Sequence, residues 1–207
     1  MQVLVSLKQQ RRSQIIADDS ALMTRIAKGD RSASRELVQM YSGKVARFAA
    51  ALLNDSVQGE DIAHDVILRL WRGAGQWQGR GTIMGWLRTA AYRASVDKIR
   101  KDHRLLSDPD GDITNLIEDC SPSPEDLARG AEISLEIEAI LSRLPYRQRS
   151  ALILSYQDGL SGAEIAEVLG VSIEAVESLL ARGRRTCRSQ LAKTYHEISG
   201  GMPSRVI

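Results

Sequence analysis

Apolar residues recur along most of this chain with the three- and four-residue spacing of amphipathic helices. No segment alternates convincingly between apolar and polar residues as a strand does, so the pattern predicts an all-α fold. We expect a first helix capped by Asp18 or Asp19 and closed by Gly29. A longer helix, capped by Asp30, follows it, and its apolar stripe consists of Leu37, Tyr41, Val45, Phe48 and Leu52.

The same pattern divides the chain into two small helical domains joined by a flexible acidic linker. Residues 105–122 have no apolar periodicity and contain the turn-forming run Asp108-Pro109-Asp110-Gly111. Ser123 and Pro124 then have the features of a helix start. The predicted parts are a loosely ordered leader over 1–17, a first domain over 18–104, the linker over 105–122, a second domain over 123–195 and a tail over 196–207.

Residues 160–188 predict two short helices joined by a tight turn. A capping box at Ser161–Glu164 opens the first helix, Gly170 ends it in a left-handed conformation, and Ser172 caps the second. Residues 182–193 then carry five basic side chains and no acidic one. This arrangement favours a helix-turn-helix that lays its second helix in the DNA major groove and holds phosphates with its basic end. A structural helical hairpin with a solvated charged end is the alternative.

Charge is segregated along the chain, although the formal net charge is only +2. Residues 80–104 contain seven basic and two acidic residues, whereas residues 105–138 contain ten acidic residues and one basic residue. These blocks indicate two nucleic-acid-facing surfaces separated by an acidic tether.

Several function classes are not supported by the sequence. No apolar run has the length that a membrane-spanning helix needs, and the N-terminus lacks the features of a signal peptide, so we expect a cytoplasmic protein. Cys120 and Cys187 stand alone without metal-ligand spacing; we expect inert thiols, with redox sensing as an alternative. No phosphate loop, zinc-protease motif or nucleophile elbow is present, so we expect no enzymatic activity, cofactor or metal.

The predicted helix over residues 60–72 has an apolar half, which includes Trp71, and a polar half with Leu68 in its middle. Leu68 is either a lone exposed leucine or the apolar centre of a docking face ringed by charges. The residues of this candidate docking face are Asp61, His64, Asp65, Leu68, Arg69 and Arg72.

A glycine-rich turn over residues 73–81 holds Trp77 at its centre. Trp77 either stacks on an unpaired base or folds back onto an apolar surface, and the sequence favours neither. We expect the next helix to start near Ile83 and to bury Trp86. The polar stripe of this helix consists of Arg93, Asp97, Arg100 and Arg104. Such a stripe fits a solvated ladder of ion pairs, but the surplus of arginine favours binding to nucleic acid.

Seven short motifs, taken in order over residues 19–193, resemble those of bacterial RNA polymerase sigma factors of the extracytoplasmic-function type, group 4 of the sigma-70 superfamily. They are Gly29-Asp30, Glu60-Asp61-Ile62-Ala63-His64-Asp65-Val66, Leu70-Trp71, Gly85-Trp86-Leu87, Asp97-Lys98-Ile99-Arg100, Leu144-Pro145-Tyr146-Arg147-Gln148-Arg149 and Ala181-Arg182-Gly183-Arg184-Arg185. The sequence departs from the family at His64, where glutamine is usual, and at Arg93, where asparagine is common. Glu177 and Leu179 stand where the recognition helix often carries a basic pair.

The resemblance implies a role for each candidate surface. The docking face would bind the clamp helices of the largest polymerase subunit, and the linker would run near the RNA exit path. The Trp77 loop and the following helix would melt and read the −10 element, with Arg93 and Asp97 lining a pocket for a flipped base; this set is Trp77, Arg80, Arg93, Asp97, Arg100, Lys101 and Arg104. The helix-turn-helix would read the −35 element through Ser172, Glu174, Ala175, Ser178, Arg182, Arg184 and Arg185.

The function that the resemblance implies is that of an alternative sigma factor. It would bind core RNA polymerase and direct promoter recognition, melting and transcription initiation for a stress or envelope-type regulon. Its partners would be core polymerase, promoter DNA and an anti-sigma factor. Two alternatives remain open: a two-domain helix-turn-helix regulator that does not act as a sigma subunit, and an interaction protein whose helix-turn-helix is only scaffold.

Overall fold

The computed structural model describes the backbone of residues 2–106, 139–156 and 159–199, with side chains over 9–101, 139–156 and 159–192. The regular elements in these ranges are all helices, which confirms the predicted fold class. The chain forms two compact units, residues 1–103 and 104–207. Most of the predicted linker and the predicted helix start at Ser123 lie outside the described residues.

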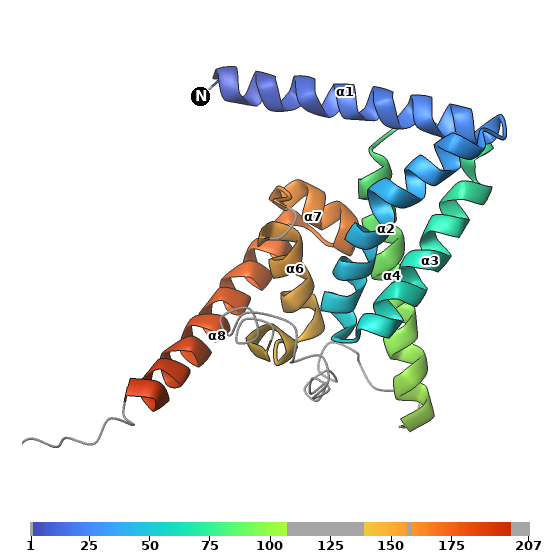
Figure 1. Cartoon of the computed structure of the whole chain (residues 1–207). Coiled ribbons are helices and arrows are strands. Elements are labelled where there is room, and N and C mark those ends of the chain that lie inside the picture. The colour runs from blue at the N-terminus through green and yellow to red at the C-terminus, as the bar shows by residue number, and fades with distance from the viewer. Residues whose placement is uncertain (1, 107–138, 157–158, 200–207) are drawn as a thin grey trace, which may run out of the picture. The chain divides into compact units, whose positions relative to one another are not determined.

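The first unit is built around a tightly packed pair of helices, α2 (Arg31–Leu53) and α3 (Ser56–Arg72) (Figure 1). Asn54 adopts a left-handed conformation (φ 57°) between them, and the Asp55 carboxylate accepts a hydrogen bond from the backbone N–H of Gln58 (2.9 Å). Every residue of the predicted apolar stripe on α2 is buried. The remaining elements of the unit are α1 (Gln2–Ala27), the 3-10 turn η1 (Ala74–Gln76) and α4 (Ile83–Leu106).

Helix α1 begins at Gln2, so the predicted helix start at Asp18 or Asp19 is wrong. The sequence upstream of these residues contains neither glycine nor proline, and nothing in it ends a helix. Asp19 is instead buried, and its carboxylate accepts hydrogen bonds from the Tyr41 hydroxyl (2.7 Å) and the backbone N–H of Ile83 (2.6 Å). Burial, together with the bond to Asp19, raises the pKa of the Tyr41 hydroxyl. Asp19 therefore caps α4 and ties its first residue to α1.

Two features of α3 differ from the prediction. The helix begins at Ser56, one turn before Glu60, because Asp55 supplies the cap. Trp71, predicted on the buried half, is 46% exposed. Its indole N–H donates to the Ser34 hydroxyl on α2 (3.0 Å), so α2 offers this side chain a polar partner at the surface and not an apolar cavity.

The second unit contains a helical stretch over residues 139–142 and then the three helices α6 (Tyr146–Tyr156), α7 (Gly162–Leu169) and α8 (Ile173–Ser199) (Figure 1). The capping box predicted at Ser161 and Glu164 is present, and Gly170 ends α7 in the left-handed region (φ 66°). The Ser172 hydroxyl accepts a hydrogen bond from the backbone N–H of Ala175 (3.2 Å) at the start of α8. These contacts confirm the helix-turn-helix.

The packing of the second unit shows where apolar spacing fails to predict burial. Tyr156 and Ile173 fit the apolar spacing of α6 and α8, but they are 67% and 46% exposed. Arg149, by contrast, is buried, with its guanidinium beside the Tyr146 ring (5.9 Å) and one N–H directed at the Ser142 carbonyl (3.4 Å). Spacing alone does not indicate which element covers a side chain, and this limit explains these differences.

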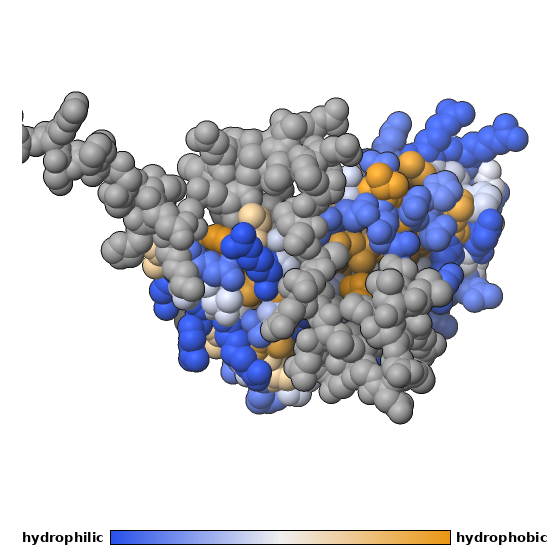
Figure 2. All heavy atoms as spheres, turned by 90° about the horizontal axis from the view of Figure 1, so that it is seen from below, coloured by the Kyte–Doolittle hydropathy of each residue, from blue (hydrophilic) through white to orange (hydrophobic). Residues whose placement is uncertain are grey.

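The surface carries small apolar patches set among hydrophilic side chains on the face that Figure 2 shows. Over the described ranges, no helix is both long enough and apolar enough to cross a bilayer. Small scattered apolar patches are normal on protein surfaces and do not by themselves mark a binding site.

Candidate functional site

The candidate docking face lies along α3. Leu68 is partly buried, and its neighbours on this face are exposed, namely Asp61, His64, Asp65, Arg69 and Arg72. Within the described part of the chain, none of these acidic or arginine side chains forms a salt bridge. The charges are therefore available to a partner and are not used to hold the unit together.

Trp71 is a residue of this region that sequence reasoning missed. It lies three positions after Leu68, on the same side of α3, and its exposed ring adds a second apolar group beside the charged face. Aromatic side chains of this kind are enriched in protein–protein interfaces. The three-residue spacing from Leu68 is a signal that could have found it, because this spacing puts Trp71 at the edge of the polar half.

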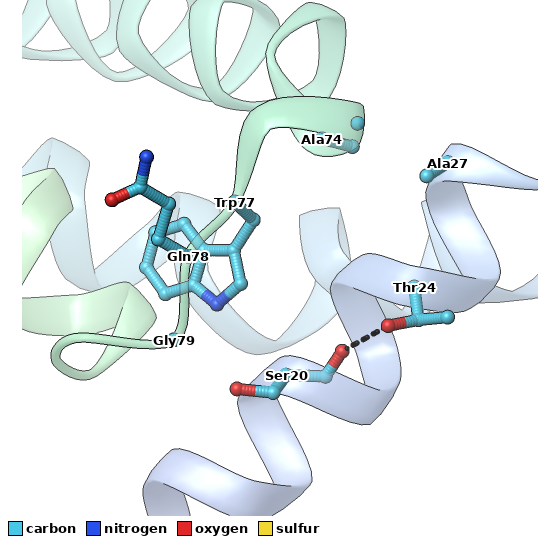
Figure 3. Close-up of a pocket in the computed structure, with 8 residues that line it drawn as sticks. Ser20, Thr24, Ala27, Ala74, Trp77, Gln78 and Gly79 are labelled. Atoms are coloured by element: carbon cyan, nitrogen blue, oxygen red, sulfur yellow. Dashed lines mark hydrogen bonds between the residues drawn. The ribbon is translucent and has the colours of Figure 1, made fainter.

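Trp77 lies against α1 at a pocket of about 360 Å³ (Figure 3). Turn η1 orders the start of the loop, and the backbone N–H of Trp77 donates to the Ala74 carbonyl (3.2 Å). The side chain is half-buried, so it neither hangs free nor belongs to the core. Arg93 and Asp97 do not line this pocket, whose walls are Ser20, Thr24 and Ala27 of α1 and Ala74, Gly75, Trp77, Gln78 and Gly79 of the loop region.

The indole N–H of Trp77 is buried and has no hydrogen-bond partner among the described residues. Figure 3 shows this ring nitrogen on the side of the ring that faces α1. An unsatisfied buried donor costs roughly 1–3 kcal/mol. An acceptor that a ligand brought to this N–H would recover part of that cost.

The arginine stripe of α4 is directed at solvent. Arg93, Asp97 and Arg100 are exposed and share one side of the helix. Arg80, on the loop before α4, and Lys101 are exposed as well. Asp97 forms no salt bridge with any described residue, so the stripe is not an ion-pair ladder over this range. Arg104 belongs to α4, but its side chain lies outside the described part.

The outward side of α8 presents a stripe of polar and basic side chains. Glu174, Ser178, Arg182 and Arg185 follow one another at spacings of four and three residues, which places them on one side of the helix. The Arg182 guanidinium donates to the Ser178 hydroxyl (2.8 Å), which holds the two side chains together. Hydrogen bonds from its own backbone N–H and from Ser172 lower the pKa of Glu174, so this carboxylate is charged at the start of the helix.

The other predicted members of this set are placed differently. Ser172 is exposed at the cap, whereas Ala175 is partly buried. Arg184 is exposed, but its guanidinium lies over the ring of Tyr156 at 5.6 Å, away from the stripe of Arg182 and Arg185. The sequence does not predict this contact, because it joins α6 to α8 through a tyrosine that fits the apolar spacing of α6.

Metal and thiol chemistry find little support in the described ranges. No three His, Cys, Asp or Glu side chains gather there as a metal site requires. Cys187 is half-buried, and burial raises the pKa of its thiol, which disfavours the reactive thiolate. Cys120 lies outside the described residues.

Two family models match the chain. The model described as "Sigma-70 region 2" matches residues 37–105, and the model described as "Sigma-70, region 4" matches residues 134–187. The first match covers α3, the Trp77 loop and nearly all of α4, and the second covers the helix-turn-helix.

Two curated relatives are similar over most of this chain. The ECF RNA polymerase sigma factor SigE of Mycolicibacterium smegmatis is 30% identical over 174 residues, which cover 83% of this chain and 67% of SigE. The probable RNA polymerase sigma factor RfaY of Xanthomonas campestris is 31% identical over 177 residues, which cover 84% of this chain but only 44% of RfaY. The chain thus spans less than half of RfaY and about two thirds of SigE.

A solved structure shares the fold. The sigma factor RpoE from Bartonella quintana, determined in complex with the anti-sigma factor NepR, superposes with a TM-score of 0.63 at 23% identity. The alignment covers 76% of this chain and 96% of that protein.

Proposed function

This chain belongs to the extracytoplasmic-function type of sigma-70 family factors, and we propose that it is an alternative sigma factor that binds core RNA polymerase and directs promoter recognition, melting and transcription initiation. The observation that carries the proposal is the presence of both regions, in order, on one chain. A regulator that only binds DNA needs the helix-turn-helix but has no use for a region 2 unit. We expect the regulon to be of the stress or envelope type and the protein to act in the cytoplasm, where the polymerase is found.

The proposal is tested by transcription with core polymerase that is free of other sigma subunits. Adding the purified chain to core enzyme and fragmented genomic DNA should give RNA with discrete start sites, while core enzyme alone should not. A chain that bound DNA fragments without core enzyme and gave no discrete starts would instead be a regulator.

We assign core binding to the face of α3. Asp61→Arg should weaken binding to core polymerase about tenfold or more, because an opposed like charge at an interface costs well over 1 kcal/mol. Leu68→Asp should act in the same direction by placing a charge at the apolar centre. Affinity is measured by fluorescence titration of labelled chain with core enzyme.

A matched control tests whether any charge reversal in this unit has the same effect. Asp18 is exposed on α1, away from the α3 face, so Asp18→Arg should leave core affinity unchanged. Leu68 is partly buried, so the fold of Leu68→Asp must be checked by thermal melting. Wild-type affinity in both α3 variants would remove this face from the interface.

We assign reading and opening of the −10 element to the Trp77 loop and α4. In this assignment Trp77 stacks on an unpaired base, while the exposed basic side chains of α4 hold the phosphates of the separated strand. The absence of an Asp97 salt bridge over the described range supports it, because the arginines beside it keep their charge for phosphate. The residues assigned are Trp77, Arg80, Arg93, Asp97, Arg100, Lys101 and Arg104.

We assign −35 recognition to the start and outward side of α8. In this assignment Glu174 and Ser178 meet base edges, and Arg182 and Arg185 hold phosphates. Binding of the chain to duplex DNA should weaken as salt rises, and Arg185→Ala should flatten the slope of log K against log salt by about one unit. Arg184→Ala should have a smaller effect, because Tyr156 holds that guanidinium away from the stripe.

The control for this slope is Arg143→Ala, because Arg143 is an exposed arginine of the same unit outside the helix-turn-helix. It should leave the slope unchanged. Equal slopes for wild type, Arg184→Ala and Arg185→Ala would make this end of α8 structural.

Regulation by an anti-sigma factor is part of the proposal. The similar RpoE was determined in complex with one, and two exposed DNA-facing surfaces provide the targets that a sequestering partner needs. Affinity purification from unstressed cells should recover a protein that blocks binding to core polymerase. Recovery of polymerase alone would argue against regulation by an anti-sigma factor.

A further inference from the structure

We propose that the N-terminal part of α1 is a further binding surface for nucleic-acid phosphates, on which Arg11 and Arg12 hold the promoter backbone about three nucleotides from the segment bound at the Trp77 loop. We call this part of α1, residues 2–18, the overhang. The inference rests on the proposed function, because it assumes that this unit holds promoter DNA. Neither arginine belongs to the sets predicted from the sequence, and the region 2 match begins only at residue 37.

The overhang has little packing with the rest of the first unit. Figure 1 shows it extending past the other helices of that unit. From Gln9 to Asp18 every side chain is exposed except Ile16, which is partly buried. The next residue, Asp19, is buried where α1 meets the start of α4. Most helical stability in proteins comes from packing, so a partner that covers the overhang would stabilise it.

The charge of the overhang defines the class of partner. Residues 1–17 contain three basic residues and no acidic residue. Arg11 and Arg12 are both exposed, and Arg11 forms no salt bridge with any residue that the structure describes. The first carboxylate along the chain belongs to Asp18, and it accepts a hydrogen bond from the Gln14 side chain (2.9 Å). The overhang therefore complements an anionic surface.

The spacing of the apolar residues favours DNA over a membrane as the anionic partner. A helix that lies on a membrane keeps one apolar side along its length. The positions that follow Leu4 and Leu7 at helical spacing are Arg11, Gln14 and Asp18, so no apolar side continues through the overhang. Nucleic-acid phosphates, by contrast, require only the basic charge.

The register of α1 connects the overhang to the DNA-facing residues of the unit. Arg12 stands two turns before Asp19 on the same side of the helix, roughly 10 Å along its axis. Asp19 accepts from the backbone N–H of Ile83 (2.6 Å), and Arg80 lies just before Ile83 in the chain. One DNA strand rises about 3.4 Å per nucleotide, so this distance corresponds to about three phosphates. A basic track thus leads from α4, through Arg80, to the overhang.

The test uses holoenzyme reconstituted from the full chain and core polymerase, on a promoter identified by its discrete start site. The double variant Arg11→Ala/Arg12→Ala should weaken promoter binding and flatten the slope of log K against log salt by nearly two units, since each phosphate contact contributes about 0.9. Arg11→Lys/Arg12→Lys should keep the wild-type slope, because a phosphate contact needs the charge and not the guanidinium. Alanine and lysine both favour helix, so both double variants should fold.

The matched control is Arg31→Ala/Arg47→Ala, because both residues are exposed arginines of α2 outside the predicted DNA-binding sets. It should leave the slope unchanged. A wild-type slope in Arg11→Ala/Arg12→Ala, or an equal change in the α2 control, would overturn the inference.

Two further measurements on Arg11→Ala/Arg12→Ala test other partners. Its affinity for core polymerase should match wild type, and a loss would make the overhang a polymerase contact instead. Neither wild type nor this variant should bind phosphatidylserine vesicles, and binding that depends on the two arginines would make the overhang a membrane contact. Either result would overturn the inference and leave the proposed function intact. Failure of wild-type holoenzyme to bind the promoter better than core enzyme alone would overturn the proposed function with it.

Discussion

Gly59→Ala should destabilise the first unit severely, whereas Gly43→Ala should stabilise it slightly. Both glycines lie inside helices, and helix propensity alone predicts a gain of roughly 1 kcal/mol from either change. Packing decides the sign. A Cβ on Gly59 would lie 2.6 Å from the backbone N and 2.7 Å from the Cα of Ala50, so α2 and α3 would have to separate.

The size of the effect follows from which atoms would clash. Overpacking costs typically 1–3 kcal/mol and occasionally more, and a clash with the backbone of a neighbouring helix belongs at the upper end, about 3 kcal/mol. At Gly43 the nearest atom is the end of the flexible Arg47 side chain, 3.6 Å away, so the gain in propensity remains. For a unit of this size, about 3 kcal/mol lowers the melting temperature by roughly 12–24 °C.

Tryptophan fluorescence measures this effect on the first unit alone, because Trp71, Trp77 and Trp86 all lie in it. Melting of the intact chain should show an early fluorescence transition for Gly59→Ala and a slightly later one than wild type for Gly43→Ala. Since α3 also carries the proposed docking face, Gly59→Ala should lose core binding as it unfolds. Equal melting temperatures for the two variants would mean that the helix pair does not need this close approach.

The features that the sequence predicted correctly depend on residues close together in the chain. The capping box at Ser161, the left-handed Gly170 and the Ser172 cap lie within a dozen positions, and each makes the contact that its residue type favours. The stripe on α2 was predicted correctly because a helix packed along its whole length must bury one face.

The features that were missed depend on contacts between distant residues. Asp19 looked like a cap for its own helix but accepts from the backbone of Ile83, far along the chain. The wall of the Trp77 pocket is likewise formed by α1, and no local pattern pairs Ser20 with that loop. Trp71 and Tyr156 fit the apolar period of their helices, yet they lie at helix ends, where the neighbouring elements leave them exposed.

Trp77→Ala should reduce opening of duplex promoters roughly ten- to hundredfold, which is the size expected if one stacking contact of about 1–3 kcal/mol per base is lost. Opening without an energy source requires that the unpaired base be held tightly enough to offset the few kcal/mol spent in flipping it. The variant should still bind core polymerase, because Trp77 lies on the loop and not on the docking face of α3. Transcription is measured on a duplex promoter and on the same promoter already mismatched through the −10 region.

The mismatched template separates melting from every other step, since its bases are unpaired before the protein arrives. Trp77→Ala should recover much of its transcription there, because the flipping cost has been removed. Trp86→Ala is the comparison variant: Trp86 is partly buried within α4 and not in the core as its spacing predicted, and truncating its packed part should still destabilise the unit and reduce transcription on both templates. Two results would contradict this assignment: Trp77→Ala opens the duplex promoter as wild type does, or it fails equally on the mismatched one. Either result would mean that Trp77 only packs against α1 and that melting depends on other side chains.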